Sequence, residues 1–68
     1  MQLIAKVYEH IINLEALDRR LGEDIKTFAS HNDQLGIDIA KEARRAAQND
    51  MFAFQQIYDN LRNKKEAQ

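Results

Sequence analysis

Apolar residues recur along both halves of this chain at alternating steps of three and four, the spacing that keeps side chains on one face of a helix. The first row consists of Ile4, Val7, Ile11, Leu14, Asp18, Leu21, Ile25 and Phe28, and the second of Ile37, Ala40, Arg44, Ala47, Met51, Phe54, Tyr58 and Leu61. Each row predicts one long helix packed against a helical partner. With a short connection between them, we expect an all-α fold, an antiparallel two-helix hairpin that resembles a coiled coil.

Each row carries one charged residue where an apolar one is expected, Asp18 in the first and Arg44 in the second. The two charges are opposite in sign and about equally far from the central turn, so antiparallel pairing places them in adjacent layers of the seam. We interpret them as a partly buried ion pair that fixes the register of the two helices. The alternative is a polar spot that recognises a ligand.

The helix boundaries follow from the turn residues and the glycines. We expect a single domain over 1–68, with helix one at about 2–29, a turn at about 30–33, helix two at about 33–63 and a frayed tail at 64–68. The segment from Ser30 to Asp33 supplies side-chain oxygens that can cap the start of helix two. Gly22 could instead end helix one early and give a monomer of three helices. We favour one continuous helix, because the apolar row passes through Gly22 without a change of phase.

Length and charge narrow the classes of protein further. The chain has 68 residues, no Cys and no Pro, and its formal net charge is -1 from 10 basic and 11 acidic residues. This balance favours neither a strongly basic nucleic-acid binder nor an acidic mimic of DNA. The N-terminal segment is interrupted by Lys6, Glu9 and His10 and fits neither a signal peptide nor a membrane span. We therefore expect a soluble cytoplasmic protein.

A second apolar row lies beside the first on one side of the predicted hairpin. It comprises Leu3, Leu17, Ile39, Ala43, Ala46, Ala53 and Ile57. The two rows together are wider than one helical neighbour can cover. We therefore expect a homodimer in which two hairpins form a two-fold symmetric four-helix bundle. Which of the two apolar flanks forms the dimer stays open.

The opposite flank carries an aromatic residue on an otherwise polar helix face. Tyr8 and Ile12 lie there on helix one, and Phe52 lies there on helix two. These side chains either cover the hairpin's own edge or bind a partner, and aromatic residues are enriched among the anchors of protein interfaces. Arg19 and Arg45 lie on the same flank nearer the turn. A partner surface that is apolar in one place and acidic in another would fit this layout.

Motifs for chemistry are missing from the sequence. The chain has no Gly-rich phosphate loop, no nucleophile elbow and no HExxH motif, and Ser30 is its only serine. His10 and His31 fall too far apart in the hairpin to share a metal ion. We expect no catalytic residues, no cofactor and no metal, and hence no enzyme.

Three classes of function remain, and we favour the first. It is a small protein-binding regulator or inhibitor that docks as a homodimer on a larger target protein, of the minimal kind that phages and mobile elements commonly encode. The second is a nucleic-acid binder that uses Arg19, Arg20, Lys41, Arg44 and Arg45. The third is a structural assembly module. The plan of a dimerising hairpin is similar in architecture to plasmid Rop-type RNA-binding regulators, which implies RNA or DNA binding by the bundle surface.

Overall fold

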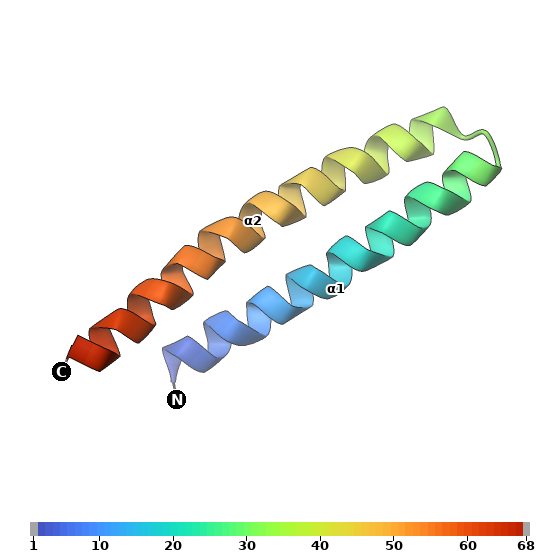
Figure 1. The fold of residues 1–68 in the computed structure, drawn as a ribbon. Coiled ribbons are helices and arrows are strands. Elements are labelled where there is room, and N and C mark those ends of the chain that lie inside the picture. Colours follow the sequence, from blue (N-terminus) through green and yellow to red (C-terminus); the bar gives the residue numbers. More distant parts are fainter. Residues whose placement is uncertain (1, 68) are drawn as a thin grey trace.

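The chain forms two long antiparallel helices joined by a three-residue turn. The computed structural model describes residues 2–67, and the side chains of residues 2–64. Helix α1 spans Leu3–Ser30 and helix α2 spans Gln34–Ala67. Figure 1 shows them side by side with both chain ends at the same end of the rod, which measures 55 × 17 × 13 Å. The prediction of an all-α antiparallel hairpin is confirmed.

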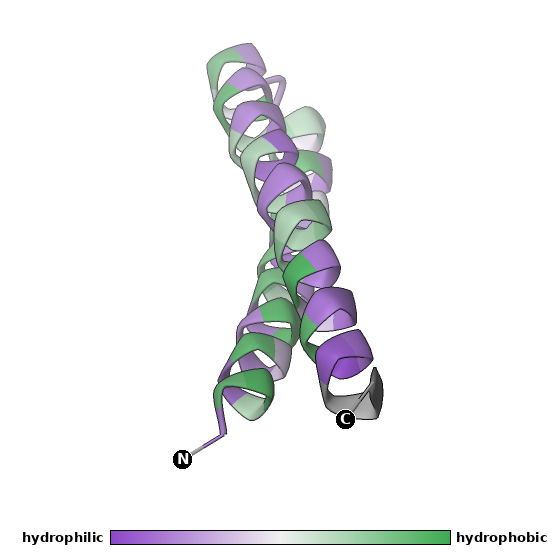
Figure 2. Cartoon of the chain, turned by 90° about the vertical axis from the view of Figure 1, so that its left-hand side faces the viewer, coloured by the Kyte–Doolittle hydropathy of each residue, from purple (hydrophilic) through white to green (hydrophobic). Residues whose placement is uncertain are grey.

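The seam between the helices is made by the two apolar rows. Every residue of both rows is buried or half-buried, and the most buried are Val7, Ile11, Leu14, Ala40 and Ala47. Among the described residues no large side chain is fully enclosed. Seen from the side, the two helices cross one another, and hydrophobic and hydrophilic residues alternate along both ribbons (Figure 2). Two crossing helices leave most seam residues only half-buried, so the core is shallow.

Helix α1 passes through Gly22 without a break, so the alternative of a third short helix is wrong. The apolar row continues on both sides of Gly22, and packing against α2 over its whole length offsets the low helix propensity of one glycine. Of the expected frayed tail, 64–68, residues 64–67 form the end of α2. Gln68 and the side chains of 65–67 lie outside the described residues.

The end of α1 is closed by a pair of backbone hydrogen bonds. The N–H of Asn32 donates to the carbonyl of Ala29 (3.1 Å), and the N–H of Asp33 donates to that of Phe28 (2.9 Å). These are the two bonds of a Schellman motif, which needs a left-handed residue just past the helix. Asn32 fills that place with φ of 55°, a conformation that asparagine tolerates better than most residues.

Asp33 also begins α2. Its Oδ1 accepts a hydrogen bond from the N–H of Gly36 (2.9 Å), and its carbonyl accepts one from the N–H of Ile37 (3.0 Å). One residue thus closes the first helix with its N–H and caps the second with its carboxylate. Ser30 differs from the expectation, because its hydroxyl donates to the carbonyl of Thr27 (2.8 Å) and so belongs to the last turn of α1.

Gly36 allows the seam to close next to the turn. A Cβ at this position would lie 2.6 Å from Cδ1 of Phe28 and 2.8 Å from Oδ2 of Asp33. Both distances are far below van der Waals contact. The ring at the end of the α1 row can therefore pack on the first turn of α2 only because residue 36 has no side chain.

We predict that Gly36→Ala destabilises the hairpin by about 1–3 kcal/mol, the usual range for overpacking, although alanine is the better helix former. Urea unfolding followed by circular dichroism would measure the loss. The matched control is Gly22→Ala, whose Cβ would meet the end of the flexible Arg44 side chain at 3.3 Å. We expect no comparable loss there, and a gain in stability from Gly36→Ala would contradict the packing argument.

Candidate binding surfaces

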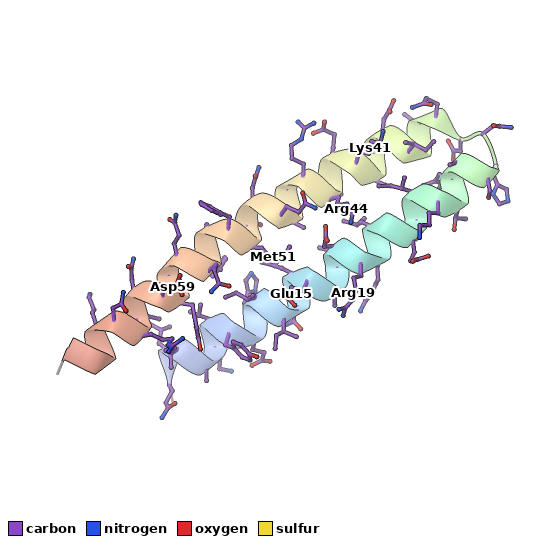
Figure 3. The ribbon with its side chains drawn as sticks, in the orientation of Figure 1. Glu15, Arg19, Lys41, Arg44, Met51 and Asp59 are labelled. Atoms are coloured by element: carbon purple, nitrogen blue, oxygen red, sulfur yellow. The ribbon has the colours of Figure 1, made fainter. Side chains whose placement is uncertain are left out.

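A polar layer crosses the seam near its middle. The Nε of Arg44 donates to Oδ1 of Asp18 at 2.8 Å, and Nε2 of Gln48 donates to the same oxygen at 3.0 Å. The Asp18 side chain is 20% exposed and that of Arg44 is 40% exposed. Figure 3 shows Arg44 in the space between the two helices. The two charged residues of the apolar rows thus pair with each other, and Gln48 joins them.

Gly22 makes room for this layer. A Cβ on Gly22 would lie 3.3–3.4 Å from the guanidinium atoms of Arg44, so that group lies against the α1 backbone one turn beyond Asp18. A methyl group at this position would require only a small shift of the flexible end of Arg44, whereas a larger side chain would displace it. The sequence interpretation treated Gly22 only as a weak point of the helix. The available signal was its position four residues after the charge of its row, which places both on neighbouring turns of one face.

The hydrogen bond from Arg44 lowers the pKa of the Asp18 carboxyl below its ordinary value of 3.8, with partial burial opposing the shift and Gln48 adding to it. In turn, the hydrogen bond to Asp18 raises the pKa of Arg44. Both groups are therefore charged at neutral pH. Among the described residues no buried side-chain nitrogen or oxygen lacks a hydrogen-bond partner. The charges of Asp18 and Arg44 are paired within the hairpin, which favours a role in register over recognition of a ligand.

We predict that Asp18→Ala lowers the thermal midpoint by more than the double change of Asp18 and Arg44 to Leu. The single change leaves the Arg44 guanidinium half-buried without its carboxylate, whereas the double change replaces both charges by apolar groups on the seam. Thermal unfolding by circular dichroism compares the variants. Midpoints equal to that of the unmodified chain in both cases would contradict a role for the pair in stability.

The ion pair also predicts a dependence on pH. Because the pKa of Asp18 is lowered in the folded chain, its stabilising contribution is complete above the unfolded value and is lost as pH falls through the folded value. We expect the midpoint of the wild type to exceed that of Asp18→Asn at neutral pH, with the difference shrinking below about pH 4. A difference that stays constant from neutral pH into this acid range would contradict the assignment.

The seam contacts fix which residues lie at the same level. Phe28 meets Gly36 near the turn, and the ring centroids of His10 and Phe54 lie 4.4 Å apart nearer the chain ends. In this register Phe52 of α2 lies at the level of Ile12 of α1. We call Tyr8, Ile12 and Phe52 the aromatic flank.

The members of the aromatic flank differ in how much the hairpin covers them. Phe52 is 68% exposed, Tyr8 53% and Ile12 45%. The Tyr8 ring contacts the Tyr58 ring with a centroid distance of 5.8 Å, and Arg62 lies over the Tyr58 ring. Among the described residues Phe52 makes no such ring contact. Tyr8 is therefore partly packed on the hairpin's own edge, while Phe52 is presented to solvent.

Basic residues lie between the aromatic flank and the turn. Figure 3 places Arg19 on α1 and Lys41 on α2, and neither forms an ion pair with another described residue. Arg45 is exposed and lies 3.5 Å from the carboxylate of Glu42. Arg44, also in this region, is engaged by Asp18. Its guanidinium is therefore less available to a phosphate group than those of exposed arginines such as Arg19.

The second apolar row is uncovered in the hairpin. All seven of its members are exposed: Leu3, Leu17, Ile39, Ala43, Ala46, Ala53 and Ile57. Leu35, beside the turn, is also exposed and was missed by the sequence interpretation because it belongs to neither row. The hairpin therefore presents exposed hydrophobic side chains on more than one side, as expected of a chain with an interaction surface.

The described residues were also searched for a metal site and for a membrane-spanning helix. Within residues 2–67 no group of three His, Asp or Glu side chains is placed to hold a metal ion. Neither described helix contains a segment apolar enough over sufficient length to cross a membrane. Comparisons with protein-family models, curated proteins and solved structures found no match to the chain.

Proposed function

We propose that this chain is a non-enzymatic protein-binding module, a small regulator or inhibitor that docks on a larger protein through the aromatic flank. The observation that carries the proposal is the exposure of Phe52. It is a large aromatic side chain with no ring contact in the described chain, level with the exposed Ile12. Burying such a side chain in a partner's pocket is a common source of binding energy at protein interfaces.

The charges near the aromatic flank support a protein partner. Arg19 and Lys41 lie between this flank and the turn without ion pairs among the described residues, so a complementary surface would place acidic groups beside an apolar pocket. A nucleic acid would offer phosphates for the cations and an unpaired base to stack on Phe52, but no apolar pocket that covers Phe52 together with Ile12. The engagement of Arg44 by Asp18 and the net charge of -1 further weaken the Rop-like alternative.

The proposed working form is a homodimer arranged as a four-helix bundle. Its support is the exposed second apolar row, which the hairpin leaves uncovered, together with the shallow core. Chains of this size rarely build enough core alone and often gain it by self-association. The dimer would bury the second apolar row and leave the aromatic flank on the outside for a target.

We predict that Phe52→Ala weakens target binding by about 30-fold or more, the effect of losing a hot spot of about 2 kcal/mol. The helical content should not change, because Phe52 lies outside the seam and is exposed. The measurement is quantitative affinity capture from a cell lysate with and without nuclease, followed by mass spectrometry. Each variant is then titrated against the protein that the wild type retains.

The matched control is Gln56→Ala, an exposed change on the polar face of α2, which should bind like the wild type. Tyr8→Ala should weaken binding less than Phe52→Ala, because Tyr8 is partly packed on Tyr58. A target bound equally by all three variants would rule out the aromatic flank. Retention that nuclease abolishes would instead favour nucleic acid and the Arg19 and Lys41 surface.

A further inference from the structure

The exposed row on α2, which we call the α2 row, is evenly spaced about its middle and has the same residue types from both ends except that Ala46 corresponds to Asp50. From the turn outward it is Ile39, Ala43, Ala46, Asp50, Ala53 and Ile57. A large side chain stands at each end and small ones stand between them, with one carboxylate next to the centre. Ile39 is 61% exposed and Ile57 43% exposed. The row is therefore symmetric about the level of residue 48.

An antiparallel copy of α2 would complement this row along its whole length. With the two-fold axis at the level of residue 48, Ile39 of one helix meets Ile57 of the other, and Ala43 meets Ala53. Small residues in the middle allow the two backbones to approach closely, and Ile at the ends fills the wider gaps. Every apolar member but Ala46 meets another apolar side chain, and Ala46 meets the stem of Asp50.

Charge distinguishes this orientation from a parallel one. In a parallel pair the residues at the centre of the contact face their own copies, so Asp50 would meet Asp50. Like charges placed in this way are destabilising. In the antiparallel pair Asp50 faces Ala46 instead of its own copy. The antiparallel orientation is therefore favoured.

The exposed area is large enough for such a contact. The chain exposes 5405 Å², whereas a compact monomer of its mass, 7.9 kDa, exposes about 4,400 Å². The excess of about 1,000 Å² is comparable with the roughly 800 Å² that each partner buries in a standard protein interface. A second copy would return the exposed surface to that of an ordinary folded protein.

We propose that a second copy of this chain covers the α2 row, with the two α2 helices antiparallel about a two-fold axis at the level of residue 48. The inference rests on the homodimer of the proposed function and assigns its interface and orientation. Leu17 of α1, exposed on the same side, borders the centre of the row. The two aromatic flanks then lie on opposite outer sides of the bundle, so one dimer presents two equivalent docking surfaces.

Cysteine cross-linking tests the interface and its direction, since the chain has no Cys of its own. The variants are Ile39→Cys, Ile57→Cys and, as a control on the aromatic flank, Phe52→Cys. Residues 39 and 57 are about 27 Å apart along one helix. We expect little disulfide dimer from any single variant under mild oxidation. A mixture of Ile39→Cys with Ile57→Cys should cross-link many times faster.

Three other cross-linking results would contradict the antiparallel α2 interface. Rapid cross-linking of Ile39→Cys alone would mean parallel helices, and cross-linking of Phe52→Cys alone would mean that the aromatic flank forms the dimer. No acceleration in the mixture would mean that the α2 row is not the interface. These results are independent of target capture, so a wrong interface can be told apart from a wrong target-binding proposal.

A second measurement covers the case in which cysteine itself weakens the contact. Ala46→Glu adds a charge at the centre of the row and should reduce the mass in sedimentation equilibrium from dimer to monomer. Gln55→Glu adds the same charge on the other side of α2, and this control should remain a dimer. A dimeric Ala46→Glu, or a wild type that is monomeric throughout the concentration range, would overturn the proposal.

Discussion

The hairpin depends on one seam of side chains between two helices and has no further layer on either side. A helix in a larger domain buries its apolar stripe against several neighbours, whereas α1 and α2 have only each other within the chain. Residues at the centre of the seam such as Ile11 and Ala47 are buried, while others such as Phe54 are only half-buried. The second apolar row stays exposed for the same reason, because two helices cannot cover all the apolar surface that this sequence carries.

A seam of this kind gains specificity from its polar layer. Apolar contacts alone would tolerate a shift of one helix along the other by a heptad, since each row repeats. Moving α2 by seven residues would separate Arg44 from Asp18 and leave both charges facing apolar side chains. The layer, completed by Gln48 and by the space at Gly22, therefore favours one register over its neighbours, in the way attested for polar positions in coiled coils.

Much of the fold could be predicted because periodicity reports directly on which helix face is buried. The two rows, the antiparallel hairpin and the proximity of Asp18 to Arg44 all follow from spacing. Residue spacing does not predict which contacts an individual side chain makes. Three contacts depend on side-chain rotamers and on distances between the helices: the Phe28 ring against Gly36, the bond from Gln48 to Asp18, and the bond from Ser30 back to α1.

The position of the aromatic flank was predictable for the same reason as the rows. The unequal exposure of Tyr8 and Phe52 was not, since it depends on the contact of Tyr8 with the ring of Tyr58.

The double use of Asp33 has a consequence for how the chain folds. Its N–H and its carboxylate tie the end of one helix to the start of the next, so the smallest closed loop in the molecule lies at the turn. Every later contact joins residues progressively farther apart in sequence, and each costs more loop entropy unless the previous one is already made. The hairpin is thus organised to close from the turn toward its chain ends. Substitutions near Asp33 should slow folding, whereas those near Tyr58 should mainly hasten unfolding, a contrast that φ-values would show.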